Sequence, residues 1–133
     1  MLLDAGVWIA SATPPHAEYE AAGQLIRKPR VPLAALDLTV YEVANVVGAR
    51  DRQPDAARIL TKVLRRRCAE RIATLDQDLV ELTLELVAEH ELTAYDAAYV
   101  AAARHNGWQL VSLDIRDLVS KGLAVTPKAA LYS

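Results

Sequence analysis

The sequence predicts an α/β fold with a central, mainly parallel sheet of four or five strands. Short apolar segments alternate along the 133 residues with longer stretches of helical periodicity, a pattern typical of βαβ units with right-handed crossovers. The apolar content of 53% is sufficient for a hydrophobic core, so we expect a single domain over residues 1–133.

The first half of the chain is expected to contain two strands and two helices, followed by the start of a third helix. Residues 1–3 are apolar and end at Asp4, after which Asp4-Ala5-Gly6 is expected to form a turn. Thr13-Pro14-Pro15 predicts the start of a helix to about residue 28, because a hydroxyl cap and a first-turn proline are typical helix-start features. A second strand is expected at residues 31–36, and a helix at residues 39–48.

The second half repeats this alternation. Helices are expected at residues 54–71, 76–89 and 93–106, and strands at residues 72–75 and 109–113, with a short edge strand at 123–126. Pro54 suits the first turn of its helix, and Gly107 is a usual residue just after a helix end. The fourth strand ends at Asp114, as the first ends at Asp4.

Acidic residues occur at four of the predicted junctions between strands and helices: Asp4, Glu42, Asp96 and Asp114. Ligands of open α/β sheets bind in the crevice at the carboxyl ends of the strands, where we expect these side chains to meet. Four neighbouring carboxylates repel one another unless a positive charge lies between them. Hard divalent cations with oxygen ligands supply that charge, so the pattern predicts a metal-dependent enzyme acting on phosphate esters.

A structural interpretation of the same acids remains open. Thr39-x-x-Glu42 and Thr93-x-x-Asp96 resemble capping boxes, in which the acid binds the N–H of the cap residue. Asp4 could cap the first helix, and Asp114 could begin a turn. Capping alone explains acids at helix starts, but it does not require them to gather at one end of a sheet.

At these residues the chain resembles PIN-domain ribonucleases, and within them the VapC-type toxins of toxin–antitoxin pairs. The resemblance covers nearly the whole chain and is strongest where short segments follow one another in order. These are Met1-Leu2-Leu3-Asp4 with Val7-Trp8-Ile9, Glu42-Val43-Ala44-Asn45, Tyr95-Asp96-Ala97-Ala98-Tyr99 with Ala101-Ala102-Ala103, and Leu110-Val111-Ser112-Leu113-Asp114. The resemblance implies a three-layer α/β/α fold, Mg²⁺ or Mn²⁺ at the acids, endonucleolytic cleavage of RNA, a homodimer and neutralisation by a cognate antitoxin.

The resemblance also assigns residues. Its acidic quartet matches Asp4, Glu42, Asp96 and Asp114, with Asn45, Ser112 and Asp117 in auxiliary positions. We expect Asp4 and Asp96 to bind metal directly, and Glu42 and Asp114 to bind it directly or through water. The chain departs from the family at Gly6, where many members carry Ser or another polar residue.

The charge distribution is polarised although the net charge is only −2. Residues 50–71 carry eight basic and three acidic side chains, whereas residues 76–96 carry seven acids and no Lys or Arg. The basic stretch could be a solvated helix face or an RNA-backbone track, and candidates for RNA contact are Arg58, Lys62, Arg65 and Arg66. The aromatic residues Tyr41 and Tyr95 could stack on bases, whereas Trp8 and Tyr99 are more typical of a core.

Composition excludes several other classes. Cys68 is the one cysteine, so no intrachain disulfide can form, and the three histidines lack zinc-site spacing. No signal peptide or membrane span is predicted, and we expect a soluble, cytoplasmic protein.

Two other functions remain open on the same fold: a non-catalytic RNA- or protein-binding module, and a housekeeping nuclease that processes RNA or acts on DNA.

Overall fold

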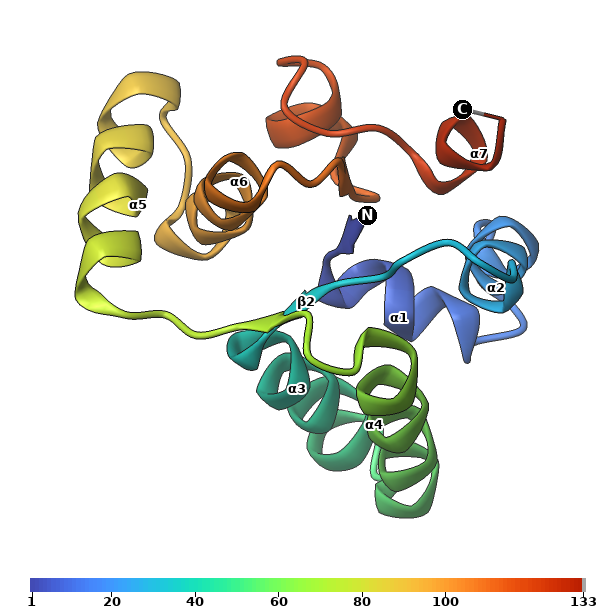
Figure 1. The fold of residues 1–133 in the computed structure, drawn as a ribbon. Coiled ribbons are helices and arrows are strands. Elements are labelled where there is room, and N and C mark those ends of the chain that lie inside the picture. The colour runs from blue at the N-terminus through green and yellow to red at the C-terminus, as the bar shows by residue number, and fades with distance from the viewer. Residues whose placement is uncertain (133) are drawn as a thin grey trace.

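The computed structural model describes residues 1–132, in which short strands alternate with helices around a small sheet (Figure 1). The strands are β1 (Leu2–Leu3), β2 (Ala35–Leu36), β3 (Ile72–Ala73) and β4 (Leu110–Val111). The α-helices are α1 (Ala5–Ser11), α2 (Tyr19–Arg27), α3 (Asp37–Val43), α4 (Pro54–Cys68), α5 (Gln77–His90), α6 (Ala94–Asn106) and α7 (Pro127–Leu131). Two π-helical segments complete the set, η1 (Ala44–Arg50) directly after α3 and η2 (Ile115–Val119) after β4.

All the strand pairings are parallel, as the alternation of strands and helices predicts. β1 pairs with β4 and β2 pairs with β3, and a bridge between Leu2 and Ala34 joins the two pairs. A further bridge between Val111 and Val125 adds the chain near residue 125 beyond β4. The order across the sheet is therefore β3, β2, β1, β4 and then the segment around Val125, which places the carboxyl ends of all strands on one edge.

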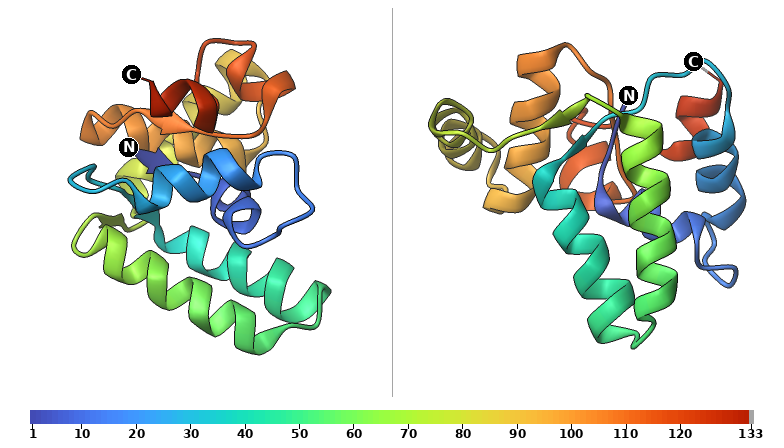
Figure 2. Two further views of the ribbon diagram at one scale, coloured as in Figure 1. Left: turned by 90° about the vertical axis from the view of Figure 1, so that its right-hand side faces the viewer. Right: turned by 60° about the horizontal axis from the view of Figure 1, so that its bottom comes forward.

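Alternate strand residues face two separate hydrophobic layers, because successive side chains of a strand point to opposite faces. Leu3, Ala35 and Val111 pack with residues of α1 to α4, whereas Leu2 and Leu110 pack with residues of α5 and α6. The expected three-layer α/β/α arrangement is thus confirmed. Figure 2 shows the hairpin formed by α3, η1 and α4 projecting from the sheet, and α5 lying outside α6.

The start of the chain differs from the expectation. Ala5-Gly6 opens α1 instead of forming a turn, because Asp4 caps this helix by accepting the Val7 N–H. Thr13 does not start the next helix: its hydroxyl donates to the Ile9 carbonyl, 2.7 Å away, at the end of α1. The prolines that follow lie in turns, and α2 begins only at Tyr19.

The strands are shorter than the apolar segments that predict them, at two residues each. The segment at 123–126 contributes only the single bridge at Val125, and α4 ends at Cys68 rather than near residue 71. None of the helices within residues 1–132 is both long and apolar enough to cross a lipid bilayer.

Candidate metal centre

Asp4 lies at the carboxyl end of β1, where it is held from two sides. Its Oδ1 accepts the Val7 N–H at 3.2 Å, and its Oδ2 accepts a hydrogen bond from the buried Ser112 hydroxyl. The same Ser112 Oγ accepts the Asp114 N–H at 3.0 Å. Ser112 therefore ties the ends of the two central strands, β1 and β4, together through the side chain of one acid and the backbone of another.

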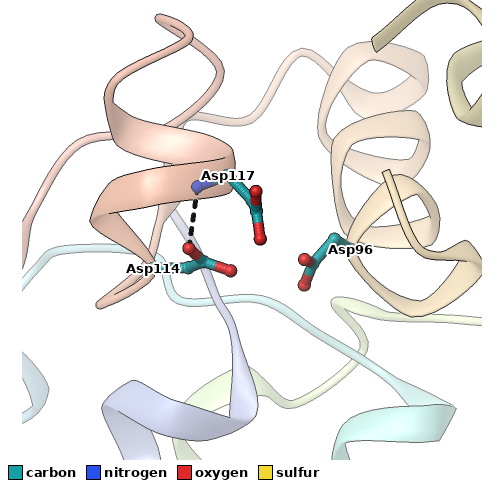
Figure 3. A group of neighbouring side chains, drawn as sticks. All are labelled: Asp96, Asp114 and Asp117. Atoms are coloured by element: carbon teal, nitrogen blue, oxygen red, sulfur yellow. Dashed lines mark hydrogen bonds between the residues drawn. The ribbon is translucent and has the colours of Figure 1, made fainter. Parts of the chain in front are cut away.

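Asp96, Asp114 and Asp117 form a compact group (Figure 3). Asp96 projects from the first turn of α6 toward η2, which carries Asp117, while Asp114 precedes η2 and accepts the Asp117 N–H at 2.9 Å. One carboxylate oxygen from each of the three lies within 4.8 Å of the others. Asp117, an auxiliary candidate from the sequence, is thus part of the group.

Glu42 lies on α3 and accepts a hydrogen bond from a buried tyrosine. The Tyr99 hydroxyl lies 2.7 Å from Glu42 Oε1 and 2.9 Å from the Thr39 hydroxyl, whose oxygen also accepts the Leu36 N–H at 3.0 Å. Asp4, Glu42 and Asp96 are close enough to influence one another's ionisation. The structure therefore brings all four predicted acids together at the carboxyl edge of the sheet.

The local environment disfavours the charged forms of these acids. Burial is the main cause that raises the pKa of Asp4 to about 6, against the lowering effect of its hydrogen bond with Ser112. The pKa of Asp96 is also raised to about 6, first by burial and then by the neighbouring Asp114 and Asp117. Burial likewise raises the pKa of Glu42, although the Tyr99 hydrogen bond lowers it.

Protein cations do not balance this negative charge. Among residues 1–132, only Asp117 of the five acids lies within 4.0 Å of a basic group, and that group is the exposed Arg116. Protonation or an external cation must therefore relieve the repulsion at neutral pH.

The capping interpretation is correct for part of the set. Asp4 and Asp114 do cap helices, and Thr93 caps α6 by accepting the Asp96 N–H. The reciprocal bond from the Thr93 N–H to the Asp96 carboxylate is absent from the described part of the chain. Glu42 belongs to no capping box, because α3 starts earlier, at Asp37, and its carboxylate faces Tyr99 instead.

The donor set fits a hard divalent cation. An Mg²⁺ ion with oxygen ligands at about 2.1 Å places opposite ligands about 4.2 Å apart, so three oxygens within 4.8 Å of one another can share one ion after small side-chain movements. The hydrogen bond that each of Asp4 and Asp114 accepts from a helix N–H group occupies one lone pair of its carboxylate. Further lone pairs remain for an ion.

Comparison with known proteins agrees with this geometry. The PIN domain family model matches residues 1–120. The chain belongs to the PIN-domain family. It is 32% identical to "Ribonuclease VapC3" of Pyrobaculum aerophilum over 96% of this chain and 98% of that protein. It is 36% identical to "Exonuclease VapC9" of the same organism over 71% of this chain and 70% of that protein.

A solved structure, a toxin–antitoxin complex from Klebsiella pneumoniae, matches with a TM-score of 0.72 and 22% identity over 95% of this chain and 96% of that chain. The likeness confirms the fold. The family expected from the sequence, the fold class and the enzyme class, a PIN-domain nuclease homologous to VapC proteins, are all confirmed.

Two further family-derived positions of this PIN domain differ in how close they lie to the acids. Asn45 is exposed in η1, and within residues 1–132 its side chain makes no hydrogen bond. Gly6 lies in α1 beside the cluster: a Cβ there would be 3.4 Å from Asp4 Oδ1 and 3.9 Å from Leu113 Cδ1. A small side chain at this position would therefore touch the first acid directly, as the family pattern implies.

The basic residues of α4, and Arg71 just after it, lie away from the cluster. Arg67 Nε donates to the Ile26 carbonyl at 2.7 Å, and Arg71 Nε donates to the Leu33 carbonyl at 2.8 Å, both near the amino ends of the strands. The exposed Arg65 and Arg66 precede Arg67 directly and so lie near that opposite edge. Nearer the start of α4, Arg58 pairs with Asp55 and Lys62 is exposed. All four candidates are accessible to RNA, but none is among the neighbours of the acids.

The aromatic residues divide as the sequence suggests. Trp8 and Tyr99 are buried, whereas Tyr41 and Tyr95 are 75% and 63% exposed. The direct hydrogen bond from Tyr99 to Glu42, supported by Thr39, is the feature that sequence reasoning missed. Its one indication was position, since Tyr99 follows Asp96 by three residues and so lies about one helical turn away.

Proposed function

We propose that this protein is an Mg²⁺- or Mn²⁺-dependent endoribonuclease and the toxin of a toxin–antitoxin pair. The observation that supports the activity is the convergence of Asp4, Glu42, Asp96, Asp114 and Asp117 with almost no balancing protein charge. Homology to VapC nucleases supports the reaction class and the choice of RNA as substrate.

Bound divalent ions would neutralise the scissile phosphate and lower the pKa of an attacking water. The protein's own contribution is to hold oxygen ligands in place before the substrate arrives. Ser112 fixes Asp4, the N-terminal end of η2 fixes Asp114, and Tyr99 fixes Glu42. Asp96 is close enough to Asp114, Asp117 and Glu42 to be influenced by their charges, and so can share an ion with these acids.

Exposed side chains next to the acids suit a single-stranded substrate. Tyr41 precedes Glu42, Tyr95 precedes Asp96, and the 55% exposed Ile115 follows Asp114. Unstacked RNA bases bind to exposed aromatic faces with little dependence on sequence. We therefore place the nucleotides flanking the scissile phosphate against these side chains.

The test is cleavage of total cellular RNA by the purified protein, with the ends of the products mapped by sequencing. Parallel reactions contain Mg²⁺, Mn²⁺ or EDTA, and compare wild type with Asp96→Asn and with the control Glu85→Gln, an exposed acid on α5. We expect discrete cuts that need metal, disappear in Asp96→Asn and persist in Glu85→Gln.

A circularised form of the RNA that is cut then separates two modes of action. Only an endonuclease can cut a molecule without ends, whereas trimming limited to linear RNA would show an exonuclease, the activity named for VapC9. If wild type neither cuts RNA nor binds Mn²⁺, the acids have only structural roles and the non-catalytic module is correct. Metal-dependent cuts confined to precursors of stable RNAs would favour the housekeeping nuclease.

An antitoxin partner is supported by the likeness to a toxin–antitoxin complex, and a homodimer by the family resemblance. Expression of the chain should arrest growth, and co-expression of the protein encoded next to it should relieve the arrest. Light scattering after size exclusion should give twice the chain mass. A monomer at micromolar concentration would contradict the homodimer. Growth arrest that also occurs with Asp96→Asn would contradict the assignment as a nuclease toxin.

A further inference from the structure

A chain of hydrogen bonds leads from the core of the protein to Glu42. It starts at the Leu36 N–H, which donates to Thr39 Oγ1 at 3.0 Å. Thr39 Oγ1 lies 2.9 Å from the Tyr99 hydroxyl, and that hydroxyl lies 2.7 Å from Glu42 Oε1. Thr39 is fully buried and Tyr99 is 3% exposed, so water does not compete for these bonds.

The direction of the chain follows from the chemistry of its groups. An ionised carboxylate only accepts hydrogen bonds, so the single proton of the Tyr99 hydroxyl must point to Glu42. Tyr99 oxygen then accepts from Thr39, whose own oxygen accepts from the Leu36 N–H. Every donor and acceptor in the chain is used in one direction, which fixes the position of Glu42 Oε1 and leaves Oε2 for another partner.

The Thr39 oxygen has a local role, because it accepts the N–H of Leu36 at the start of α3, but its proton is directed outside the helix. A buried helical Thr usually satisfies its hydroxyl on the preceding turn, as Thr83 does by donating to the Leu79 carbonyl at 2.7 Å. Thr39 instead turns to Tyr99, 60 residues away in the sequence. Of the three buried polar residues in the described chain, Thr39 and Ser112 both connect to acids of the cluster.

We propose that Tyr99, supported by Thr39, is a positioning residue that holds the Glu42 carboxylate ready for the divalent ion. The inference rests on the proposed metal-dependent activity and adds the device that organises one of its ligands. Glutamate has three rotatable side-chain bonds, and a free Glu42 would lose that freedom when it binds an ion. With Oε1 already fixed, this loss occurs on folding rather than on binding.

The test removes one hydroxyl and measures Mn²⁺ binding to the metal-free protein by calorimetry. Tyr99→Phe keeps the buried ring, and we expect its Mn²⁺ affinity to fall about 10- to 100-fold, the range typical of groups that orient metal ligands. RNA cleavage should fall at low Mn²⁺ and recover at saturating Mn²⁺, since the ligand itself remains. In a Glu42→Ala background, Tyr99→Phe should change the affinity no further.

Thr39 gives a second, independent pair of variants. Thr39→Ser keeps the hydroxyl and should bind Mn²⁺ as wild type does, whereas Thr39→Val keeps the shape and should weaken binding several-fold. This pair replaces the tyrosine variant if Tyr99→Phe does not fold, as judged by circular dichroism.

Three results would overturn the inference. They are unchanged Mn²⁺ affinity in folded Tyr99→Phe, an equal loss in the Glu42→Ala background, and identical behaviour of Thr39→Ser and Thr39→Val. Each leaves wild-type Mn²⁺ binding and RNA cleavage intact, so the proposed function would stand. Failure of wild type to bind Mn²⁺ would instead remove the proposed function and the inference together.

Discussion

Neutralising one acid of the cluster should stabilise the metal-free protein. Asp96 is the acid of choice because its carboxylate faces Asp114, Asp117 and Glu42. Asp96→Asn keeps the shape of the side chain and removes its charge. We expect the variant to melt at a higher temperature than wild type in EDTA, and to lose metal-dependent cleavage.

The magnitude follows from linkage between protonation and folding. The folded-state pKa of Asp96 is raised from 3.8 to about 6, so the folded chain binds more protons than the unfolded chain between these values. Stability therefore falls as pH rises through this window. At about 1.36 kcal/mol per pKa unit, ionisation of Asp96 in the folded protein costs about 3 kcal/mol of stability. Because Asp96 is only partly buried, solvent screening reduces it to about 1.5 kcal/mol. Asp96→Asn also removes a favourable charge at the start of α6, which lowers the stability gained by the variant by about 0.5 kcal/mol.

The net gain of about 1 kcal/mol corresponds to a rise of about 3–5 °C in melting temperature for a domain of this size. Differential scanning calorimetry in EDTA at pH 7.5 measures it, and at pH 4 the difference from wild type should vanish. Glu85→Gln, which relieves only exposed like-charge contacts on α5, should gain less than about 1 kcal/mol and should show no comparable pH dependence between 4 and 6. An Asp96→Asn protein that melts at or below the wild-type temperature at pH 7.5 would refute the electrostatic argument.

Three further outcomes are expected. Asp4 and Asp96 each have a pKa of about 6 and must lose a proton to bind a metal ion. As pH drops below about 6, Mn²⁺ affinity should therefore fall about tenfold per pH unit for each of the two that binds the ion. A pH-independent affinity in calorimetric titrations would exclude them as ligands. Arg67→Gln should lose about 2 kcal/mol of unfolding free energy in urea, because its guanidinium binds backbone carbonyls, whereas the exposed Arg66→Gln should change it by less than about 0.5 kcal/mol. Gly6→Ala should stabilise α1 by about 0.5–1 kcal/mol, and Gly6→Ser should also raise Mn²⁺ affinity; equal affinities of the two variants would show that a polar group beside Asp4 is irrelevant.

The sequence was sufficient to predict the alternation of strands and helices and the position of Asp4, Asp96 and Asp114 at their junctions, because both depend on local periodicity and chain order. It was not sufficient to predict how those acids are supported. Thr39 has the spacing of a helix cap with Glu42, yet α3 begins two residues earlier and Thr39 becomes a buried link to Tyr99. The link depends on a hydrogen bond between α3 and α6, whose partners lie 60 residues apart in the sequence, and no local pattern encodes such a contact.

Helix capping and metal binding are complementary rather than competing roles for these acids. A cap needs a carboxylate at the N-terminal end of a helix, and in parallel βα units those helix ends gather at the carboxyl edge of the sheet. Asp4 caps α1, and Asp114 caps η2, with one oxygen each, so the start of the following helix orients both carboxylates at that edge, and Ser112 adds a second hydrogen bond to Asp4. Glu42 lies in the interior of α3, where it cannot act as a helix cap, and it accepts a hydrogen bond from the buried Tyr99 instead. The hydrogen bond from Tyr99 on α6 thus does for Glu42 what the start of the following helix does for Asp4 and Asp114.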